Sequence, residues 1–239
     1  MNIRKNLFAV AALGLAIAPS VGAAFQWPHG LQPYVTTGAT CSFLGNGELI
    51  VNREKEDAAE ESYDASWNPC SGCRFSAGLW LPVPKYRGSM YGELEYQTNR
   101  TAKTESFGPI SENEPYMEFS SDTVLLNLYC QSAAISNFFQ PYIGLGCGAG
   151  FLKGAGCFYS ENVYAFRESR TTRFVYKCTA GLSFELRRDV SIEAECSAIL
   201  FPGRKNEKSI ALDNPSSVII SKSLPKRSLQ LSAGICNTF

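Results

Sequence analysis

Two pairs of glutamates have a spacing that could support acid–base chemistry. Glu93 and Glu95, like Glu193 and Glu195, are two positions apart, so within a β-strand the carboxylates of each pair lie on one face. Two neighbouring carboxylates are the catalytic groups of glycoside hydrolysis. Lys177 stands in another alternating segment, and a buried ammonium group near such acids would pair with them. These five residues are the first candidates for a site.

Histidine and cysteine chemistry has weaker support. His29 is the only histidine, which disfavours His-based metal sites and Ser–His catalysis. Cys70 and Cys73 have the spacing of a redox motif, but no alternation of strands and helices surrounds them. A zinc site would need a second cysteine pair with ligand spacing, which the sequence lacks. We therefore predict a protein that is not an enzyme and holds no cofactor or metal.

Alternate glycines from Gly144 to Gly150 form a glycine-rich run. A phosphate-binding loop would continue into Lys followed by Ser or Thr, and this run does not. The alternation is that of a strand, in which small residues make room for long side chains on the same face.

Alternation of apolar and polar residues recurs along the chain and would position these groups. A period of two indicates β-strands, and about ten residues is the length of a tilted strand that crosses a bilayer. Eight segments alternate in this way: residues 34–43, 75–83, 90–97, 124–130, 142–151, 173–185, 191–200 and 228–239.

The connections between these segments are alternately long and short. Long connections follow the first, third, fifth and seventh segments, and short ones follow the second, fourth and sixth. This order is expected when one end of a barrel faces the exterior and the other faces the periplasm. We therefore predict an all-β fold, an eight-stranded antiparallel up-and-down transmembrane β-barrel, with both termini of the chain on the side of the short turns.

The apolar face of each strand is predicted to face lipid, whereas in a soluble barrel it would face inward. The polar face is rich in Gly, Ser and Thr, which suits the narrow interior of eight strands. Aromatic residues near the strand ends are expected to form an interfacial girdle: Phe43, Trp80, Tyr86, Tyr96, Phe151, Phe174, Phe184 and Phe239.

This orientation places the candidate acids inside the barrel. The residues expected in a luminal charge network around Lys177 are Glu93, Glu95, Glu185, Glu193, Glu195 and Arg173. Such a network could be an acidic path for ions or a structural plug that ties the strands together. The plug is favoured because an eight-stranded lumen leaves little room for water, and no sugar could reach the carboxylates there.

Nine cysteines cannot all pair within the chain, because nine is odd. Five lie on the lipid-facing parity, where cysteine serves as a small apolar residue: Cys41, Cys130, Cys147, Cys178 and Cys196. Cys236 lies on the luminal parity. Cys70, Cys73 and Cys157 lie in or beside predicted outer loops, where a loop disulfide and reactive surface thiols are the two interpretations.

Residues 1–23 have the pattern of a secretory signal peptide. Arg4 and Lys5 precede a short apolar run, and Val21-Gly22-Ala23 fits cleavage before Ala24. Residues 24–239 would then form the barrel domain. Lys+Arg and Asp+Glu both number 22, so no basic excess favours nucleic acid, and no run of about 18 apolar residues predicts a membrane-spanning helix.

Several segments resemble strands of a known family. Residues 140–148, with the sequence QPYIGLGCG, resemble the fifth strand of the small outer-membrane surface-antigen barrels. Residues 91–96 and 124–129 are similar to the third and fourth strands of that family, and residues 174–186 to the sixth.

The last residue, Phe239, resembles the terminal aromatic of the insertion signal that the barrel-assembly machinery reads, although Asn237 stands where the family usually carries an aromatic. The resemblance extends over about residues 31–239. It implies an eight-stranded barrel of the opacity-type and OmpA-type transmembrane class, with no peptidoglycan-binding domain after it.

These features predict a monomeric protein of the cell outer membrane, exported through the signal peptide. Its long outer loops would form a surface antigen or adhesin-like binding surface, and the barrel would support the membrane. The expected partners are the lipid bilayer, the barrel-assembly machinery during insertion and host-surface molecules. Two alternatives remain open, namely a small porin or channel and a soluble exported lipocalin-like barrel that binds a ligand.

Overall fold

The computed structural model describes the chain from Gly30 to Phe239 with several gaps. The described ranges are residues 30–45, 47–53, 61–65, 67–83, 88–103, 116–132, 139–159, 163–187, 189–202, 207–210, 218–223 and 226–239. The signal peptide predicted over residues 1–23 and His29 therefore lie outside the described residues.

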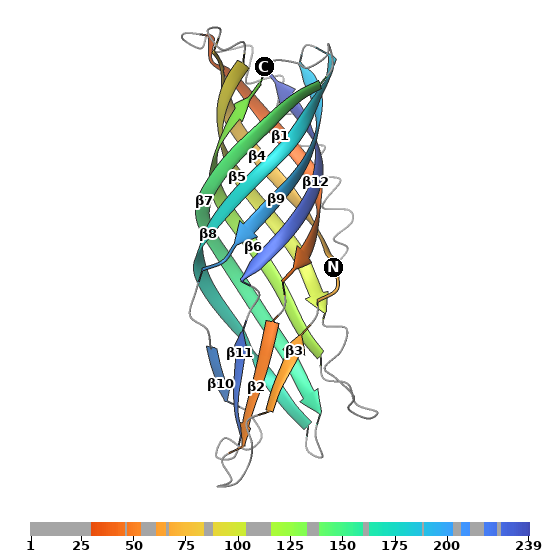
Figure 1. Cartoon of the computed structure of the whole chain (residues 1–239), viewed down its shortest axis with the longest axis vertical. Coiled ribbons are helices and arrows are strands. Elements are labelled where there is room, and N and C mark those ends of the chain that lie inside the picture. Colours follow the sequence, from red (N-terminus) through yellow and green to blue (C-terminus); the bar gives the residue numbers. More distant parts are fainter. Residues whose placement is uncertain are drawn as a thin grey trace.

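Eight long antiparallel strands close into a barrel, with β1 paired to β12 (Figure 1). This confirms the predicted fold, and each strand contains one of the alternating segments. The barrel strands are β1 (Gln32–Leu44), β4 (Cys70–Val83), β5 (Gly88–Lys103), β6 (Tyr116–Gln131), β7 (Phe139–Tyr159), β8 (Val163–Arg187), β9 (Val190–Leu200) and β12 (Arg227–Thr238).

The strands are staggered around the barrel. Cross-strand partners followed once around the wall from Tyr34 lead back to β1 at Leu44, ten residues further on (44 − 34). Ten residues over eight strands is about 1.25 residues per strand, and this stagger tilts the strands against the barrel axis.

A second, four-stranded sheet lies beyond the end of the barrel where β1 ends and β12 begins (Figure 1). Its order is β10-β11-β2-β3, with strands β2 (Gly47–Arg53), β3 (Glu61–Ala65), β10 (Glu207–Ile210) and β11 (Val218–Ser223). The prediction of polar loops without strands was wrong here. Short apolar runs rich in β-branched residues, Leu49–Val51 and Val218–Ile220, favour strands once a partner is available.

The end of the barrel that carries the second sheet is also built from β7 and β8. Both strands continue into residues 153–170, which the sequence predicted to be a loop. We call this end of the barrel the loop end, and the other end, where short turns join the strands, the turn end.

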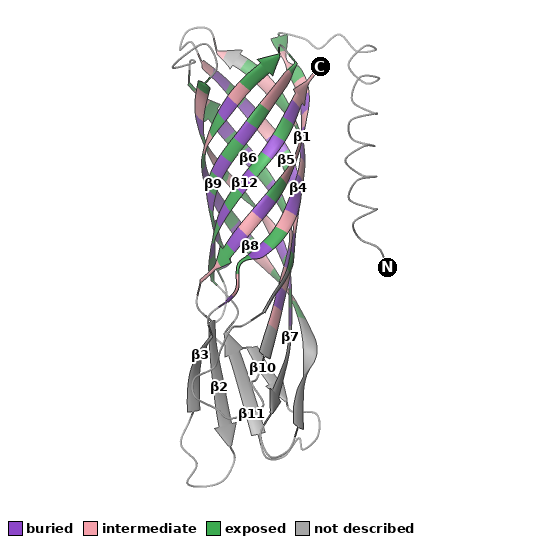
Figure 2. Ribbon diagram, turned by 90° about the vertical axis from the view of Figure 1, so that its right-hand side faces the viewer, coloured by how far each residue is buried: buried purple, intermediate pink, exposed green. Residues whose placement is uncertain are grey.

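The outer wall of the barrel is apolar and its interior is polar. On the outer face of the wall, Leu145 and Leu128 are 67% and 63% exposed. On the inner face, Glu95 and Lys177 are 0% and 1% exposed. Figure 2 shows this alternation of buried and exposed residues along the barrel strands. The predicted outward orientation of the apolar face is therefore present, and the soluble lipocalin-like alternative, which needs the reverse orientation, is wrong.

Tyr86 of the predicted girdle lies outside the described residues, and among the other members one faces the opposite way. Trp80 has the parity of Arg74 and packs against tyrosines inside the barrel. Phe43, Tyr96, Phe151 and Phe174 are exposed on the outer wall, as the prediction requires.

Candidate functional site

The luminal charge network lies in the middle of the barrel and contains all five predicted residues. Glu93 and Glu95 come from β5, Lys177 from β8, and Glu193 and Glu195 from β9. Lys177 Nζ lies 2.8 Å from Glu95 Oε2 and 3.2 Å from Glu195 Oε1, so it joins two walls of the barrel. All five side chains are buried.

Arg74 of β4 is a second luminal cation, which the sequence interpretation missed. Its guanidinium donates to Glu193 at 3.0 Å and forms an ion pair with Glu195. The sequence could have revealed it. Phe75, Ala77 and Leu79 share the outward face of the strand, so Arg74, directly before Phe75, points into the lumen.

Glu93 is stabilised by neutral donors. The hydroxyls of Tyr34 and Tyr129 donate to its carboxylate at 3.1 and 2.9 Å, and the amide of Asn127 donates at 3.0 Å. Among the residues that the structure describes, Glu93 has no cationic partner. The charged layer thus holds four carboxylates and two cations, Arg74 and Lys177.

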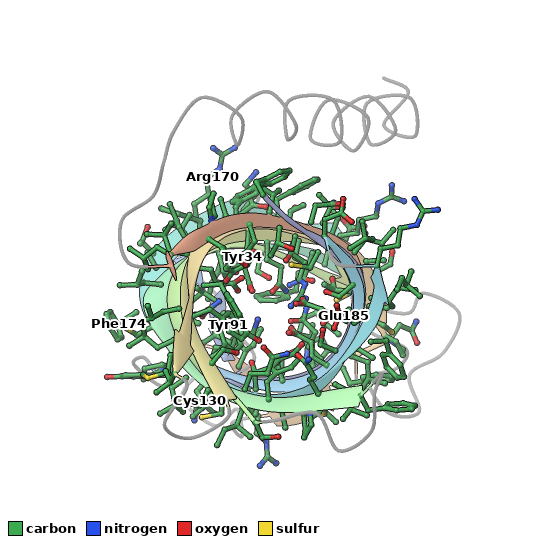
Figure 3. The ribbon with its side chains drawn as sticks, turned by 90° about the horizontal axis from the view of Figure 1, so that it is seen from above. Tyr34, Tyr91, Cys130, Arg170, Phe174 and Glu185 are labelled. Carbon is green, nitrogen blue, oxygen red and sulfur yellow. The ribbon has the colours of Figure 1, made fainter. Side chains whose placement is uncertain are left out.

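Two further predicted members of the network lie away from its centre. Arg173 is half-buried on the luminal parity of β8, nearer the loop end. Glu185 is exposed at the turn end, and Figure 3 shows it pointing into the barrel mouth.

A layer of tyrosines separates the charged layer from the turn end. Tyr34, Tyr91, Tyr129 and Tyr142 are buried together with Cys236. The rings of Tyr91 and Tyr129 are stacked with centroids 4.6 Å apart. Three of these rings lie over a glycine of the neighbouring strand, and the pairs are Tyr34 with Gly78, Tyr129 with Gly144, and Tyr142 with Gly181.

Toward the loop end, the two sides of the lumen differ in polarity. On β1, β5 and β12, hydroxyl and amide groups hydrogen-bond to one another; Asn99, for example, accepts from Ser42 at 3.1 Å. On β6 to β9 and just beyond, small buried hydroxyl residues such as Ser121 and Thr123 alternate with large apolar side chains, namely Phe119, Leu125, Leu152, Val175, Ile199 and Phe201. The lumen is filled with side chains at this level, as the plug interpretation expects.

The cysteines divide between the two faces of the wall. Cys130, Cys147, Cys178 and Cys196 are exposed on the outer wall, Cys41 is half-exposed there, and Cys236 is buried in the lumen. Figure 3 shows Cys130 on the outside of the ring of strands. The eight cysteines whose side chains are described are free thiols.

The three cysteines predicted to lie in or beside outer loops, Cys70, Cys73 and Cys157, belong to strands near the loop end. Cys70 and Cys73 are both buried in β4, and positions three apart in a strand point to opposite faces, so these two thiols cannot pair with each other. Cys157 belongs to β7, and its side chain lies outside the described residues. Cys70 Sγ instead lies 3.7 Å from the backbone oxygen of Ser42.

The C-terminal residue is held at the turn end. Phe239 donates its backbone N–H to the Pro33 oxygen at 3.0 Å, and Thr238 donates to the Asp189 oxygen at 2.9 Å. These bonds anchor the last strand beside the first, where the predicted insertion signal lies.

No group of three or more possible metal ligands occurs within the described ranges. In that same part of the chain, no helix is long and apolar enough to cross a membrane.

No protein-family model and no curated protein sequence matches this chain. Solved structures do match. OprG, an outer membrane protein of Pseudomonas aeruginosa, has a TM-score of 0.54 at 11% identity, covering 87% of this chain and 95% of its own. The outer membrane protease OmpT of Escherichia coli has a TM-score of 0.53 at 10% identity, with coverages of 90% and 99%.

Neisserial surface protein A is a third match, with a TM-score of 0.48 at 13% identity over 88% of this chain and 99% of its own. At these identities the similarity concerns the fold and not the activity. The barrel wall is apolar on its outside and carries ion pairs on its inside, the reverse of a soluble barrel. Together with the matches to OprG and OmpT, this shows that the chain has the fold of the outer-membrane β-barrels.

Proposed function

We propose that the protein resides in the outer membrane as a sealed barrel and presents its loop end to the exterior as a surface antigen or adhesin-like binding surface. The observation that carries this proposal is the inversion of polarity around all eight strands. A wall of exposed Leu, Ile and Phe is stable only in contact with lipid, and the buried charges inside are stable only when paired.

The filled lumen favours a binding role over the alternative of a channel. The largest side chains with almost no solvent exposure include Lys177, Leu125, Leu152, Gln97 and Gln230, all inside the barrel. They come from five strands and occupy the interior, through which a water-filled pore would have to pass.

The loop end favours contact with large molecules. Two long connections contribute the four-stranded sheet β10-β11-β2-β3, and β7 and β8 extend beyond the barrel. Binding surfaces are commonly carried by connections that a rigid scaffold holds in place. Host-surface molecules are the partners proposed for this end.

Location in the membrane is tested by extraction and gel migration. We expect the protein to leave cells only with detergent, and its unheated form to migrate differently from the boiled form. Mass spectrometry should find Ala24 at the N-terminus, leaving 216 residues (239 − 23), if residues 1–23 direct export. Release in a periplasmic wash would contradict the proposal.

The binding surface is tested by replacing residues 47–65 with a short Gly-Ser turn, which removes β2 and β3 and leaves the barrel strands intact. We expect this variant to fold, by its heat-dependent migration, and to lose attachment to host cells. The matched control replaces only the turn residues 84–87. Equal attachment by both variants would contradict an adhesive role for this sheet.

Conductance separates the channel from the sealed barrel. Purified protein in planar bilayers should give no single-channel steps, because paired charges and apolar side chains fill the lumen. Regular steps would favour the channel.

Deletion of Phe239 should reduce insertion into the outer membrane if the barrel-assembly machinery reads this residue.

A further inference from the structure

A cavity of about 220 Å³ opens at the turn end of the lumen. We call it the vestibule. Gln32, Arg187 and Thr238 lie at the ends of their strands and form its rim, whereas Tyr34, Glu193 and Cys236 lie deeper and form its floor. Figure 3, viewed from this end, shows Tyr34, Tyr91 and Glu185 directed toward the interior.

Aromatic rings form one side of the vestibule. Trp80 and Tyr91 line it, and Trp80 packs against the tyrosine layer. Tyr91 meets Tyr34 edge to face, with centroids 5.7 Å apart, and stacks on Tyr129. Rings held rigidly in this way offer faces and edges to a ligand with little loss of entropy, and the faces attract cations.

Tyr91 has an unused polar group at the cavity. Its side chain is 9% exposed, and its hydroxyl makes no hydrogen bond with any residue that the structure describes. The other three tyrosines of the layer differ, because Tyr34 and Tyr129 donate to Glu93 and Tyr142 donates to Glu195. The Tyr91 hydroxyl therefore stands at the wall of the cavity without a protein partner among the described residues and is available to a ligand there.

The charged layer that contains Glu193 carries an excess of negative charge. Glu193 shares Arg74 with Glu195, and Lys177 is shared between Glu95 and Glu195. Within the described part of the chain, Glu93 accepts from neutral donors alone, so the layer just below the vestibule has two more carboxylates than cations there. At the rim, Glu185 and Arg187 are both exposed and balance each other in charge.

We propose that the vestibule binds a small organic cation that carries a primary ammonium group on a short alkyl chain. The ammonium donates to the Glu193 carboxylate and to the Tyr91 hydroxyl, which accepts. The methylenes lie against Trp80 and Tyr91, where cation–π attraction adds to burial. The carboxylates below the vestibule repel an anion. A neutral sugar would not neutralise their excess negative charge. The site lies at the opposite end from the proposed binding surface and does not depend on it.

Isothermal titration of the purified full-length protein in detergent micelles with putrescine tests this proposal. We expect saturable binding of one putrescine per barrel, and no binding of 1,4-butanediol, which has the same length without charge. Tyr91→Phe should weaken binding about tenfold or more through loss of one hydrogen bond to a charged group. Trp80→Leu should weaken it by a similar factor.

Trp67→Phe is the matched control, because Trp67 lies at the loop end beside Phe119 and should leave the affinity unchanged. Heat-dependent migration checks that each variant is folded. The proposal is overturned if putrescine gives no saturable heat at millimolar concentration, if butanediol binds equally, or if neither Tyr91→Phe nor Trp80→Leu changes the affinity. None of these results depends on cell attachment, so they leave the proposed function to its own test.

Discussion

Lys177 Nζ lies 2.8 Å from Glu95 Oε2, with both side chains almost completely removed from solvent. The two residues are 82 positions apart and belong to β8 and β5, which two other strands separate in the wall. The ion pair therefore spans the lumen and ties distant strands together.

Loss of the Lys177 ammonium should destabilise the barrel strongly. In Lys177→Met, Glu95 keeps its burial but loses its cation, and removal of one partner of a buried pair typically costs about 3–5 kcal/mol. Urea unfolding in micelles measures the free energy. Lys226→Met, at an exposed lysine, is the control and should change it little. Equal stability of the two variants would mean that the pair does not hold the barrel together.

Gly144 is a position where a side chain would collide with an aromatic ring. A Cβ there would overlap the ring of Tyr129, its cross-strand partner. We expect Gly144→Ala to cost about 1–3 kcal/mol, as overpacking does, and Tyr129→Leu to relieve part of that cost. In Gly92→Ala the nearest atom is the flexible Leu128 Cδ2 at 3.3 Å, so this control should be nearly neutral. Additive effects of the two substitutions would count against the ring–glycine contact.

Phe119 anchors the loop end. It is 1% exposed and meets the ring of Trp67 with centroids 5.9 Å apart. We expect Phe119→Ala to cost about 3–5 kcal/mol through the cavity it leaves. Phe174→Ala, at a half-exposed residue of the outer wall, should cost less in micelles, where detergent fills the space. A reversed order in urea unfolding would place Phe119 outside the packed interior.

Much of the barrel could be predicted because a strand with one face in lipid and one in a narrow lumen must alternate strictly. The parity of Leu126 against Asn127, or Cys178 against Lys177, is enough to place these side chains on opposite faces. The luminal position of Glu193 and Glu195 follows from the same rule.

Other features depend on pairing between distant segments, which alternation does not reveal. The sheet of β2, β3, β10 and β11 forms only because two connections far apart in the chain meet at the loop end. The sequence places Cys70 and Cys73 only in or beside a loop, because the alternation of β4 weakens at Gly72, although the strand continues there. The vestibule depends on how deep each ring reaches, which strand parity cannot specify.

Four of the five outward cysteines gather near one level of the wall. Cys147 is paired with Tyr176, two positions from Cys178, which is paired with Ala198, two positions from Cys196. Leu231 then links Cys196 to Cys41. A stagger of about 1.25 residues per strand brings these four thiols close to one height. In liposomes, brominated lipids should quench a fluorophore attached at each of the four to a similar extent, and very different quenching would contradict this register.

Thiol labelling in intact proteoliposomes tests most directly whether the apolar face of the strands faces lipid. Variants that retain only Cys41, Cys147 or Cys178 are exposed to a charged, water-soluble maleimide or to an apolar one, and mass spectrometry counts the adducts. We predict labelling by the apolar reagent alone. Labelling of all three thiols by the water-soluble reagent would show that the apolar face of the strands does not face lipid.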